Sequence, residues 1–195
     1  MNDKLPALIL PGLGNSGLGH WQSHWERRDD SCERVEQREW DTPRCEDWIA
    51  RLGAAVARRA GSLVLVAHSA ACALVLHWTA KAQTQHLQRI RGALLVSPAD
   101  PDGPNFPQGT MGFGPMPLRR LPFPSIVVAS TDDPYVDPPR ARQFADAWGS
   151  RFVLLQAAGH INVASGYGPW PEGFALLDDL RAVKPAECSN RDASA

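Results

Sequence analysis

Three residues far apart in the chain are of the types that together carry out acyl transfer. Ser69 offers a hydroxyl group, His160 an imidazole and Asp133 a carboxylate. A serine hydroxyl is a weak nucleophile at neutral pH, so it needs a neutral imidazole within hydrogen-bond reach to take its proton. A carboxylate on the far ring nitrogen can fix the tautomer of that imidazole. We therefore predict that Ser69 is a nucleophile, His160 its base and Asp133 the supporting acid.

Each residue taken alone also has a structural explanation. A serine that opens a helix is often a plain N-cap, and a carboxylate before Pro134 is often part of an Asx-turn. Asp132 precedes Asp133 directly, and spacing favours Asp133 as the partner of the histidine. A lone histidine after a strand, such as His160, is usually structural. The joint occurrence of all three at the ends of predicted strands favours a shared site, because ligands bind at that edge of open α/β sheets.

Six short apolar runs are predicted as strands, separated by stretches of helical length. They are Ala7–Leu10, Arg34–Gln37, Leu63–Ala67, Ala93–Ser97, Ile126–Ser130 and Phe152–Leu155. Four of them are continuously apolar, which is typical of strands covered on both faces. The sequence therefore predicts an α/β fold: a mostly parallel six-stranded sheet with helices on both faces. We expect one domain over residues 1–183 and a flexible tail over 184–195.

Helix starts are marked by capping residues followed by proline. Thr42 is predicted to cap a helix with Pro43 at its first position, and Asp137 with Pro138 repeats that signal. A last helix is predicted from Pro171 to Val183. Between Asp100 and Pro124 the chain is rich in proline and glycine, which predicts a long ordered loop that serves as a lid, a binding wall or a plain surface segment.

The predicted strand 63–67 leads through His68 into Ser69 and then into an Ala-rich helix. This pattern is typical of a nucleophile elbow, in which crowding demands small neighbours around the serine. A tetrahedral intermediate also needs hydrogen-bond donors for its oxyanion. We predict that the backbone amides of Ala70 and Leu13 supply them. The residues expected to contact substrate are Gly12, Gly14, His68 and Trp170.

Two other functions compete with the hydrolytic one. Gly12 to Gly17 spells the G-x-G-x-x-G pattern of dinucleotide-binding loops, with Glu36 or Glu39 as the ribose ligand. That interpretation leaves Ser69 and His160 unexplained. The alternative from another class is a non-catalytic hydrolase-like binding module that contacts a protein partner through the loop 100–124.

Composition bounds the remaining possibilities. Lys and Arg number 20 and Asp and Glu 21, so a basic surface for nucleic acid is not expected. No apolar stretch is long enough to span a membrane, and no signal peptide is visible. The four cysteines have no metal-ligand or redox spacing, which favours the cytoplasm. His20 and His24 lack a third ligand, so we predict no metal and no cofactor; the oligomeric state stays open.

The chain resembles the small serine hydrolases of the retinoblastoma-binding protein 9 and YdeN type, within the α/β hydrolases. The shared motifs are Pro11-Gly-Leu-Gly-Asn-Ser16, His20-Trp-Gln22, Ala67-His-Ser69, Ser130-Thr-Asp-Asp-Pro134, Gly159-His-Ile-Asn162, Ser165-Gly166 and Trp170-Pro171. The resemblance covers about residues 5 to 181. It implies a minimal α/β-hydrolase fold without a separate cap domain, a triad of Ser69, Asp133 and His160, and a small ester, thioester or amide as substrate. The family usually has glycine where this chain has Ala67 and Ala71.

Overall fold

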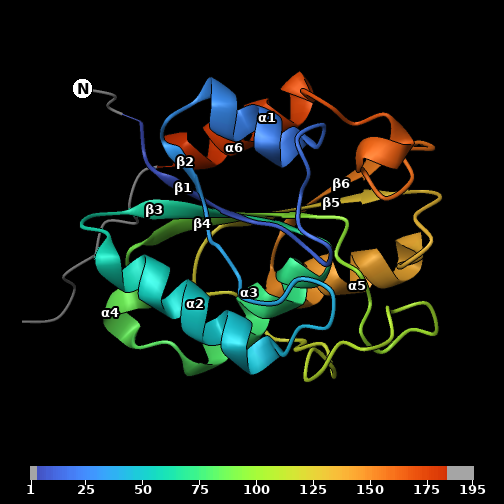
Figure 1. The fold of residues 1–195 in the computed structure, drawn as a ribbon, viewed down its shortest axis with the longest axis horizontal. Coiled ribbons are helices and arrows are strands. Elements are labelled where there is room, and N and C mark those ends of the chain that lie inside the picture. The colour runs from blue at the N-terminus through green and yellow to red at the C-terminus, as the bar shows by residue number, and fades with distance from the viewer. Residues whose placement is uncertain (1–3, 184–195) are drawn as a thin grey trace, which may run out of the picture.

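A parallel six-stranded sheet runs through the centre of the computed structural model, in which residues 4–183 are described (Figure 1). The strands are β1 (Ala7–Leu10), β2 (Cys32–Arg34), β3 (Leu63–His68), β4 (Ile90–Val96), β5 (Ser125–Ser130) and β6 (Arg151–Leu155). Their order across the sheet is β2-β1-β3-β4-β5-β6, and every neighbouring pair is parallel. The predicted α/β fold is therefore confirmed, and no separate cap domain is found among the described residues.

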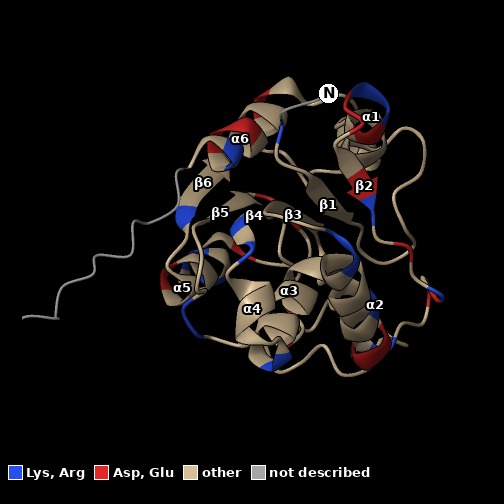
Figure 2. Ribbon diagram, turned by 90° about the vertical axis from the view of Figure 1, so that its left-hand side faces the viewer, with Lys and Arg blue, Asp and Glu red and all other residues tan. Residues whose placement is uncertain are grey.

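Helices cover both faces of this sheet, as the view along its edge shows (Figure 2). On one face lie α1 (Trp21–Arg28) and α6 (Pro171–Ala182). On the other face lie α2 (Cys45–Arg58), α3 (Ala70–Lys81), the short α4 (Thr84–Leu87) and α5 (Pro138–Trp148). A 3₁₀ turn, Val163–Ser165, follows β6.

The two faces of each strand feed two separate cores. In β1, Leu8 and Leu10 join the core under α2, α3 and α5, whereas Ala7 and Ile9 join the core under α1 and α6. All four are buried, which explains why the strands read as continuous apolar runs. Each large apolar side chain that is removed from water in this way contributes about 1.5–3 kcal/mol to folding.

The fourth strand spans Ile90–Val96 and so begins earlier than the predicted Ala93–Ser97. The second strand and the start of α2 are also misplaced, and these two errors come from long-range pairing. The second strand spans Cys32–Arg34 instead of Arg34–Gln37, because the chain leaves the edge of the sheet soon after Arg34. Helix α2 begins at Cys45 with Arg44 as a cap that makes no side-chain bond, so Thr42 is not the cap. The carbonyl of Pro43 instead accepts from Met111 of the long loop.

Other predicted features agree with the structure. The Asp137 side chain accepts from the Arg140 amide at the start of α5, with proline at the first helical turn. The chain between β4 and β5 contains no helix or strand and remains a described, ordered loop. The expected tail over 184–195 lies outside the described residues.

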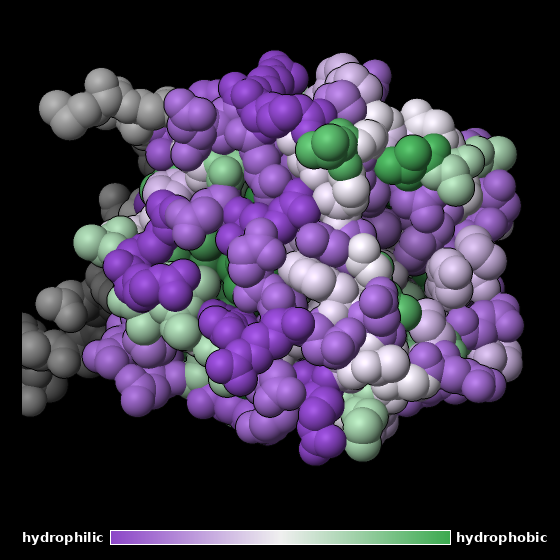
Figure 3. Space-filling view, in the orientation of Figure 1, coloured by the Kyte–Doolittle hydropathy of each residue, from purple (hydrophilic) through white to green (hydrophobic). Residues whose placement is uncertain are grey.

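The surface carries mixed chemistry. Basic and acidic residues are interspersed over the helices in Figure 2, and the face in Figure 3 is largely polar with small separate apolar spots. Within residues 4–183, no helix has the length and apolar character to cross a bilayer.

Candidate active site

The chain turns sharply from β3 into α3 at Ser69. This residue has φ 58° and ψ −127°, a conformation that L-residues rarely adopt. Its amide bonds the Val96 carbonyl of the neighbouring strand, and the flanking Ala67 and Ala71 are fully buried. The elbow predicted from the sequence is thus formed with alanines in place of the usual glycines. It places the Ser69 hydroxyl at the carboxyl edge of the sheet.

The side chains of Ser69, His160 and Asp133 form one continuous chain of hydrogen bonds. Ser69 Oγ is 2.9 Å from His160 Nε2, and His160 Nδ1 is 2.9 Å from each oxygen of Asp133. A carboxylate only accepts, so the proton lies on Nδ1 and leaves Nε2 free to accept from the serine. The Asp133 carboxylate is buried and also accepts from the Tyr135 amide at 3.0 Å. The structure therefore brings the three predicted residues together in the predicted order.

The second carboxylate of the pair, Asp132, holds the loop that carries the histidine. Its Oδ1 accepts from the Gly159 amide at 2.7 Å and from the Ser130 hydroxyl at 2.6 Å. The hydrogen bond from Ser130, followed by that from Gly159, lowers the pKa of Asp132 below its usual value. The His160 amide donates to Ser165 Oγ at 3.2 Å. Sequence reasoning assigned no role to Asp132 or Ser165, although both lie within the motifs that the family resemblance rests on.

The loop after β1 packs directly against the elbow. A Cβ atom at Gly12 would lie 2.8 Å from Ser69 Cβ, closer than real Cβ atoms approach. The Asn15 amide bonds the Gly12 carbonyl at 3.2 Å and closes a turn that contains Leu13 and Gly14, the latter with φ +69°. Within the described part of the chain, the Leu13 amide has no acceptor.

Ala70 occupies the first position of α3, where the backbone amide has no partner inside its own helix. Helix N-termini favour negative charge, because their free N–H groups point outward and the peptide dipoles align. Two N–H groups, those of Leu13 and Ala70, are therefore available on either side of Ser69.

Two further imidazoles lie behind His160. The rings of His68 and His160 are 4.8 Å apart, and those of His20 and His68 are 4.9 Å apart. His68 Nε2 donates to the His160 carbonyl at 2.9 Å. Burial, aided by the charge of Arg34, lowers the pKa of His20 to about 4, and burial also holds the pKa of His68 well below 6.5. Both rings are therefore neutral at neutral pH.

A cavity of about 340 Å³ opens over Ser69. Its walls are formed by residues from five segments of the chain: Leu13, Asn15, Gly17, His20, His68, Ser69, Pro107, Tyr135, His160, Asn162, Val163 and Ala164. Of the residues predicted to contact substrate, only His68 lines it. Gly12 lies behind Ser69 and Gly14 shapes the turn, so both act through the backbone. The predicted loop 100–124 contributes Pro107 to the wall.

Trp170 is placed elsewhere than predicted. It is buried, stacks on Trp25 at 5.9 Å and meets Trp21 edge-on at 5.3 Å. Its ring therefore belongs to the core between α1 and α6 and not to the wall of the cavity. A tryptophan ring is favoured both in an apolar core and against a ligand, so the sequence did not distinguish the two positions for Trp170.

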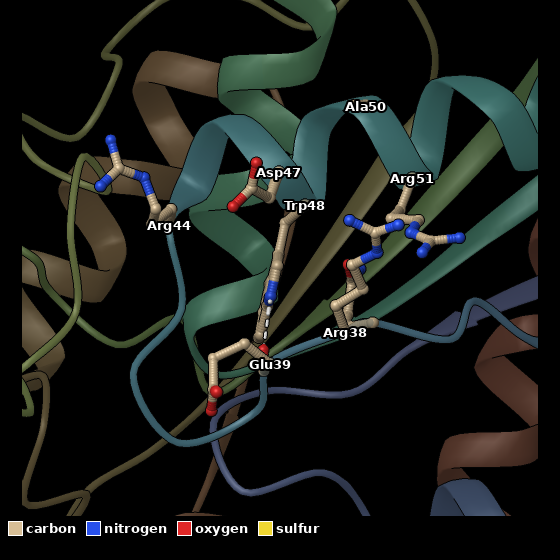
Figure 4. Close-up of a pocket in the computed structure, with 8 residues that line it drawn as sticks. Arg38, Glu39, Arg44, Asp47, Trp48, Ala50 and Arg51 are labelled. Carbon is tan, nitrogen blue, oxygen red and sulfur yellow. Dashed lines mark hydrogen bonds between the residues drawn. The ribbon is translucent and has the colours of Figure 1, made fainter.

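A second cavity, also of about 340 Å³, lies beside α2 and is shown in Figure 4. Charged side chains dominate its walls, among them Arg38, Glu39 and Arg51. It contains no serine, cysteine or histidine, so it lacks a nucleophile paired with an imidazole base. We therefore take the cavity over Ser69 as the candidate active site, because a hydroxyl, an imidazole and a carboxylate are hydrogen-bonded to one another there.

The dinucleotide interpretation requires a helix that opens directly on the third glycine of the loop. The helix after β1 begins only at Trp21, capped by His20, and the intervening loop contacts Ser69 instead. Among residues 4–183, no group of three His, Cys, Asp or Glu side chains is arranged to hold a metal ion. Cys32, Cys45 and Cys72 are free and buried.

Comparison with known proteins agrees with this geometry. Residues 7–179 match the family model described as serine hydrolase. A structure described as a YdeN-like hydrolase from Pectobacterium atrosepticum is 31% identical, with 91% of each chain covered and a TM-score of 0.80. The ydeN gene product from Bacillus subtilis is 22% identical, covers 90% of this chain and 98% of its own, and has a TM-score of 0.73.

More distant structures share the fold alone. A thermophilic esterase from Thermogutta terrifontis is 16% identical over 91% of this chain and 90% of its own, with a TM-score of 0.65. No match was found among curated proteins. The family match over most of the chain and the YdeN-like relative together confirm the resemblance seen in the motifs. The chain belongs to the serine hydrolase family and is a hydrolase of the α/β-hydrolase fold.

Proposed function

We propose that the protein cleaves small carboxylic esters through an acyl-enzyme formed on Ser69. The observation that carries this proposal is the unbroken line of hydrogen bonds from Ser69 Oγ through His160 to Asp133, each 2.9 Å long. Nucleophile, base and orienting acid are then within hydrogen-bond reach before substrate arrives, which is the geometry that serine activation requires.

In the first half of the reaction, Ser69 Oγ attacks the ester carbonyl carbon while His160 Nε2 takes the hydroxyl proton. The negative charge that develops on the carbonyl oxygen accepts hydrogen bonds from the amides of Leu13 and Ala70. Asp133 stabilises the imidazolium that forms. His160 then gives its proton to the departing alkoxide, and the C–O bond to the alcohol breaks.

In the second half, water attacks the acyl carbon and His160 takes one of its protons. The bond to Ser69 Oγ breaks, His160 returns the proton to the serine, and the carboxylic acid leaves. The two neutral imidazoles behind His160 add no positive charge of their own, so they do not oppose its transient protonation.

The size and chemistry of the cavity favour a small substrate. About 340 Å³ is near the lower limit of cavities that hold drug-sized ligands. Leu13, Pro107, Val163 and Ala164 supply apolar wall for an acyl group. Thioesters and amides are attacked through the same steps, so they are the further members of the proposed substrate class.

Labelling with a fluorophosphonate probe tests the proposal, because the probe reacts only with an activated serine. We expect one adduct per chain, located on Ser69 by mass spectrometry. Ser69→Ala should lose both the adduct and the hydrolysis of p-nitrophenyl acetate. Ser97→Ala is the matched control, since Ser97 is a buried serine just past the end of the adjacent strand whose Oγ has no partner among the described residues.

Loss of labelling in Ser97→Ala, or persistence of labelling in Ser69→Ala, would contradict the assignment. A wild-type protein that resists the probe and a broad ester panel, yet captures a specific protein partner, would instead support the binding-module alternative.

A further inference from the structure

Arg34, the last residue of β2, uses all of its hydrogen-bonding capacity. A guanidinium group has five N–H donors, and the structure gives this one five hydrogen bonds. The acceptors and distances are Glu26 Oε1 at 2.9 Å, Glu26 Oε2 at 2.8 Å, Ser23 Oγ at 2.7 Å, Asn15 Oδ1 at 2.8 Å and the Ser16 carbonyl at 2.9 Å. The side chain is only 15% exposed, so most of its donors depend on these protein acceptors.

These bonds join two different parts of the molecule. The contacts with Ser23 and Glu26 fix the guanidinium to α1, a regular helix. The contacts with Asn15 and Ser16 reach into the loop after β1, which has no helix or strand of its own. Arg34 thus connects helix α1 to a loop that contains no helix or strand.

The loop needs such a link because its backbone is in unusual conformations. Gly14 and Asn15 both have positive φ, of 69° and 64°. Asparagine adopts this conformation more readily than other non-glycine residues, but it still costs free energy unless the surroundings support it. Asn15 also closes the turn that contains Leu13 through its bond with the Gly12 carbonyl. The same turn is held at Gly14, whose amide donates to the Trp40 carbonyl at 2.9 Å. The bonds that hold Asn15 and Gly14 together set the direction of the Leu13 N–H.

We infer that Arg34 is a positioning residue that holds the Leu13 amide in place to receive the oxyanion. The inference rests on the proposed function, because Leu13 matters only if an oxyanion forms at Ser69. The Gln22 side chain on α1 supports the same loop. Its Oε1 accepts from Ser16 Oγ, and its Nε2 donates to the Leu10 carbonyl. Lysine cannot replace the arginine, since one ammonium group cannot serve acceptors on both sides of a planar fork.

The molecule contains a matched arginine for the test. Arg181 on α6 also makes five hydrogen bonds and is 6% exposed, but its partners are Leu5, Asp29, Ser31, Cys32 and Asp178, at the opposite edge of the sheet. Replacing either arginine removes a charged group of similar burial. Only Arg34 touches the loop beside Ser69.

The experiment compares Arg34→Gln, Arg34→Lys and Arg181→Gln with wild type, using p-nitrophenyl acetate kinetics, thermal unfolding and inhibition by phenylboronic acid. Boronic acids form a tetrahedral adduct on the serine and so report on the oxyanion donors. We expect Arg34→Gln to lower kcat about 100-fold, the loss typical of one oxyanion donor, with KM changed less than threefold. The boronate inhibition constant should rise by a similar factor, and Arg34→Lys should recover little.

Arg181→Gln should lower the unfolding temperature at least as much as Arg34→Gln while its kcat stays within twofold of wild type. If Arg34→Gln does not fold, Asn15→Gly decides the matter, because glycine accepts the positive φ but removes the Oδ1 that Arg34 binds. We expect about a tenfold loss of kcat in that variant.

Full kcat and boronate affinity in Arg34→Gln, or in Asn15→Gly where the former does not fold, would overturn the positioning role while leaving the proposed function intact. A wild-type protein that takes no fluorophosphonate label would remove the proposed function, and the positioning role with it. A parallel fall of kcat in Arg181→Gln would also overturn the inference, since the loss would then follow stability alone.

Discussion

Each of the two edges of the sheet carries one nearly buried arginine. The two side chains make the same number of hydrogen bonds but have different roles. At the amino edge, Arg181 of α6 bonds residues that precede β1 and β2, and so fastens the last helix to the sheet. At the carboxyl edge, Arg34 bonds the irregular loop after β1. The first arrangement adds stability to packing between regular elements, whereas the second restrains a loop that contains no helix or strand.

Electrostatics differ between the edges in the same way. At the amino edge, burial raises the pKa of Asp29, but hydrogen bonds from Ser31 and the charge of Arg181 outweigh it and hold that pKa well below its usual value. At the carboxyl edge, burial keeps His20 and His68 neutral. The amino edge thus stabilises a charged carboxylate, whereas the imidazoles next to His160 at the carboxyl edge are kept neutral.

The largest expected effect comes from comparing one carboxylate at each edge of the sheet, Asp133 and Asp29. Asp133→Asn should lower kcat about 10⁴-fold, because the amide no longer fixes the imidazole tautomer. Asp29→Asn should leave kcat unchanged and reduce only the unfolding temperature. Steady-state kinetics on p-nitrophenyl acetate with thermal unfolding of each variant measures both. An Asp133→Asn variant with near wild-type kcat would contradict the role proposed for that residue.

Arg181→Gln is expected to lower the free energy of unfolding by about 1–3 kcal/mol, because the buried Asp29 carboxylate loses its bond with the guanidinium but keeps Lys4 at 3.5 Å and the hydrogen bonds from Ser31. Urea unfolding at neutral pH measures this loss. As a control, the double variant Arg181→Gln with Asp29→Asn should recover part of the stability. No recovery in the double variant would show that the ion pair is not the source of the effect.

Acid should weaken the carboxyl edge before the amino edge. The pKa of His20 is lowered from 6.5 to about 4 by folding, so its contribution is full above about pH 6.5 and is lost as the pH falls towards 4. Each unit of pH in that range costs about 1.4 kcal/mol per such group. The contribution of Asp29 persists until the pH falls below about 4, the ordinary aspartate value.

Urea unfolding of wild type and His20→Asn at pH 7, 5.5 and 4.5 tests this order. Asparagine preserves a cap for α1 but does not titrate, so its loss of stability over this range should be smaller than that of wild type by about 3 kcal/mol. Equal losses in the two proteins would mean that His20 does not contribute to the pH dependence.

The smallest expected effects come from two glycines with equally close neighbours. A Cβ at Gly12 would lie 2.8 Å from Ser69 Cβ, and a Cβ at Gly92 would lie 2.8 Å from Leu180 Cδ2. Gly12→Ala should reduce kcat about tenfold by displacing the serine. Gly92→Ala should cost about 1–3 kcal/mol of stability through overpacking and leave kcat unchanged. Steady-state kinetics and urea unfolding of both variants measure these effects. A loss of kcat in Gly92→Ala together with a loss of stability alone in Gly12→Ala would contradict the different roles proposed for the two edges.

Local pattern was sufficient for much of the fold. Continuous apolar runs located β1, β3, β4 and β5, since burial on both faces leaves a signal within a few residues. The edge strand β6 was also located, although none of its residues is buried. The cap at Asp137 was found because its signal also lies within a few residues. The second strand and the start of α2 were misplaced, because edge pairing and the contact between Pro43 and Met111 depend on segments distant in the chain.

For the site, the residue types and chain order of Ser69, Asp133 and His160 follow from the sequence alone. Each lies at or within a few residues of the carboxyl end of a strand, and parallel strands end at one edge. The 2.9 Å distances that join them were decided by tertiary structure. So were the burial of Trp170 in the core and the five bonds of Arg34, which no spacing predicts. The partners of a side chain depend on how separate helices, strands and loops pack together. That packing is determined by residues throughout the chain and not by the sequence neighbours of the side chain.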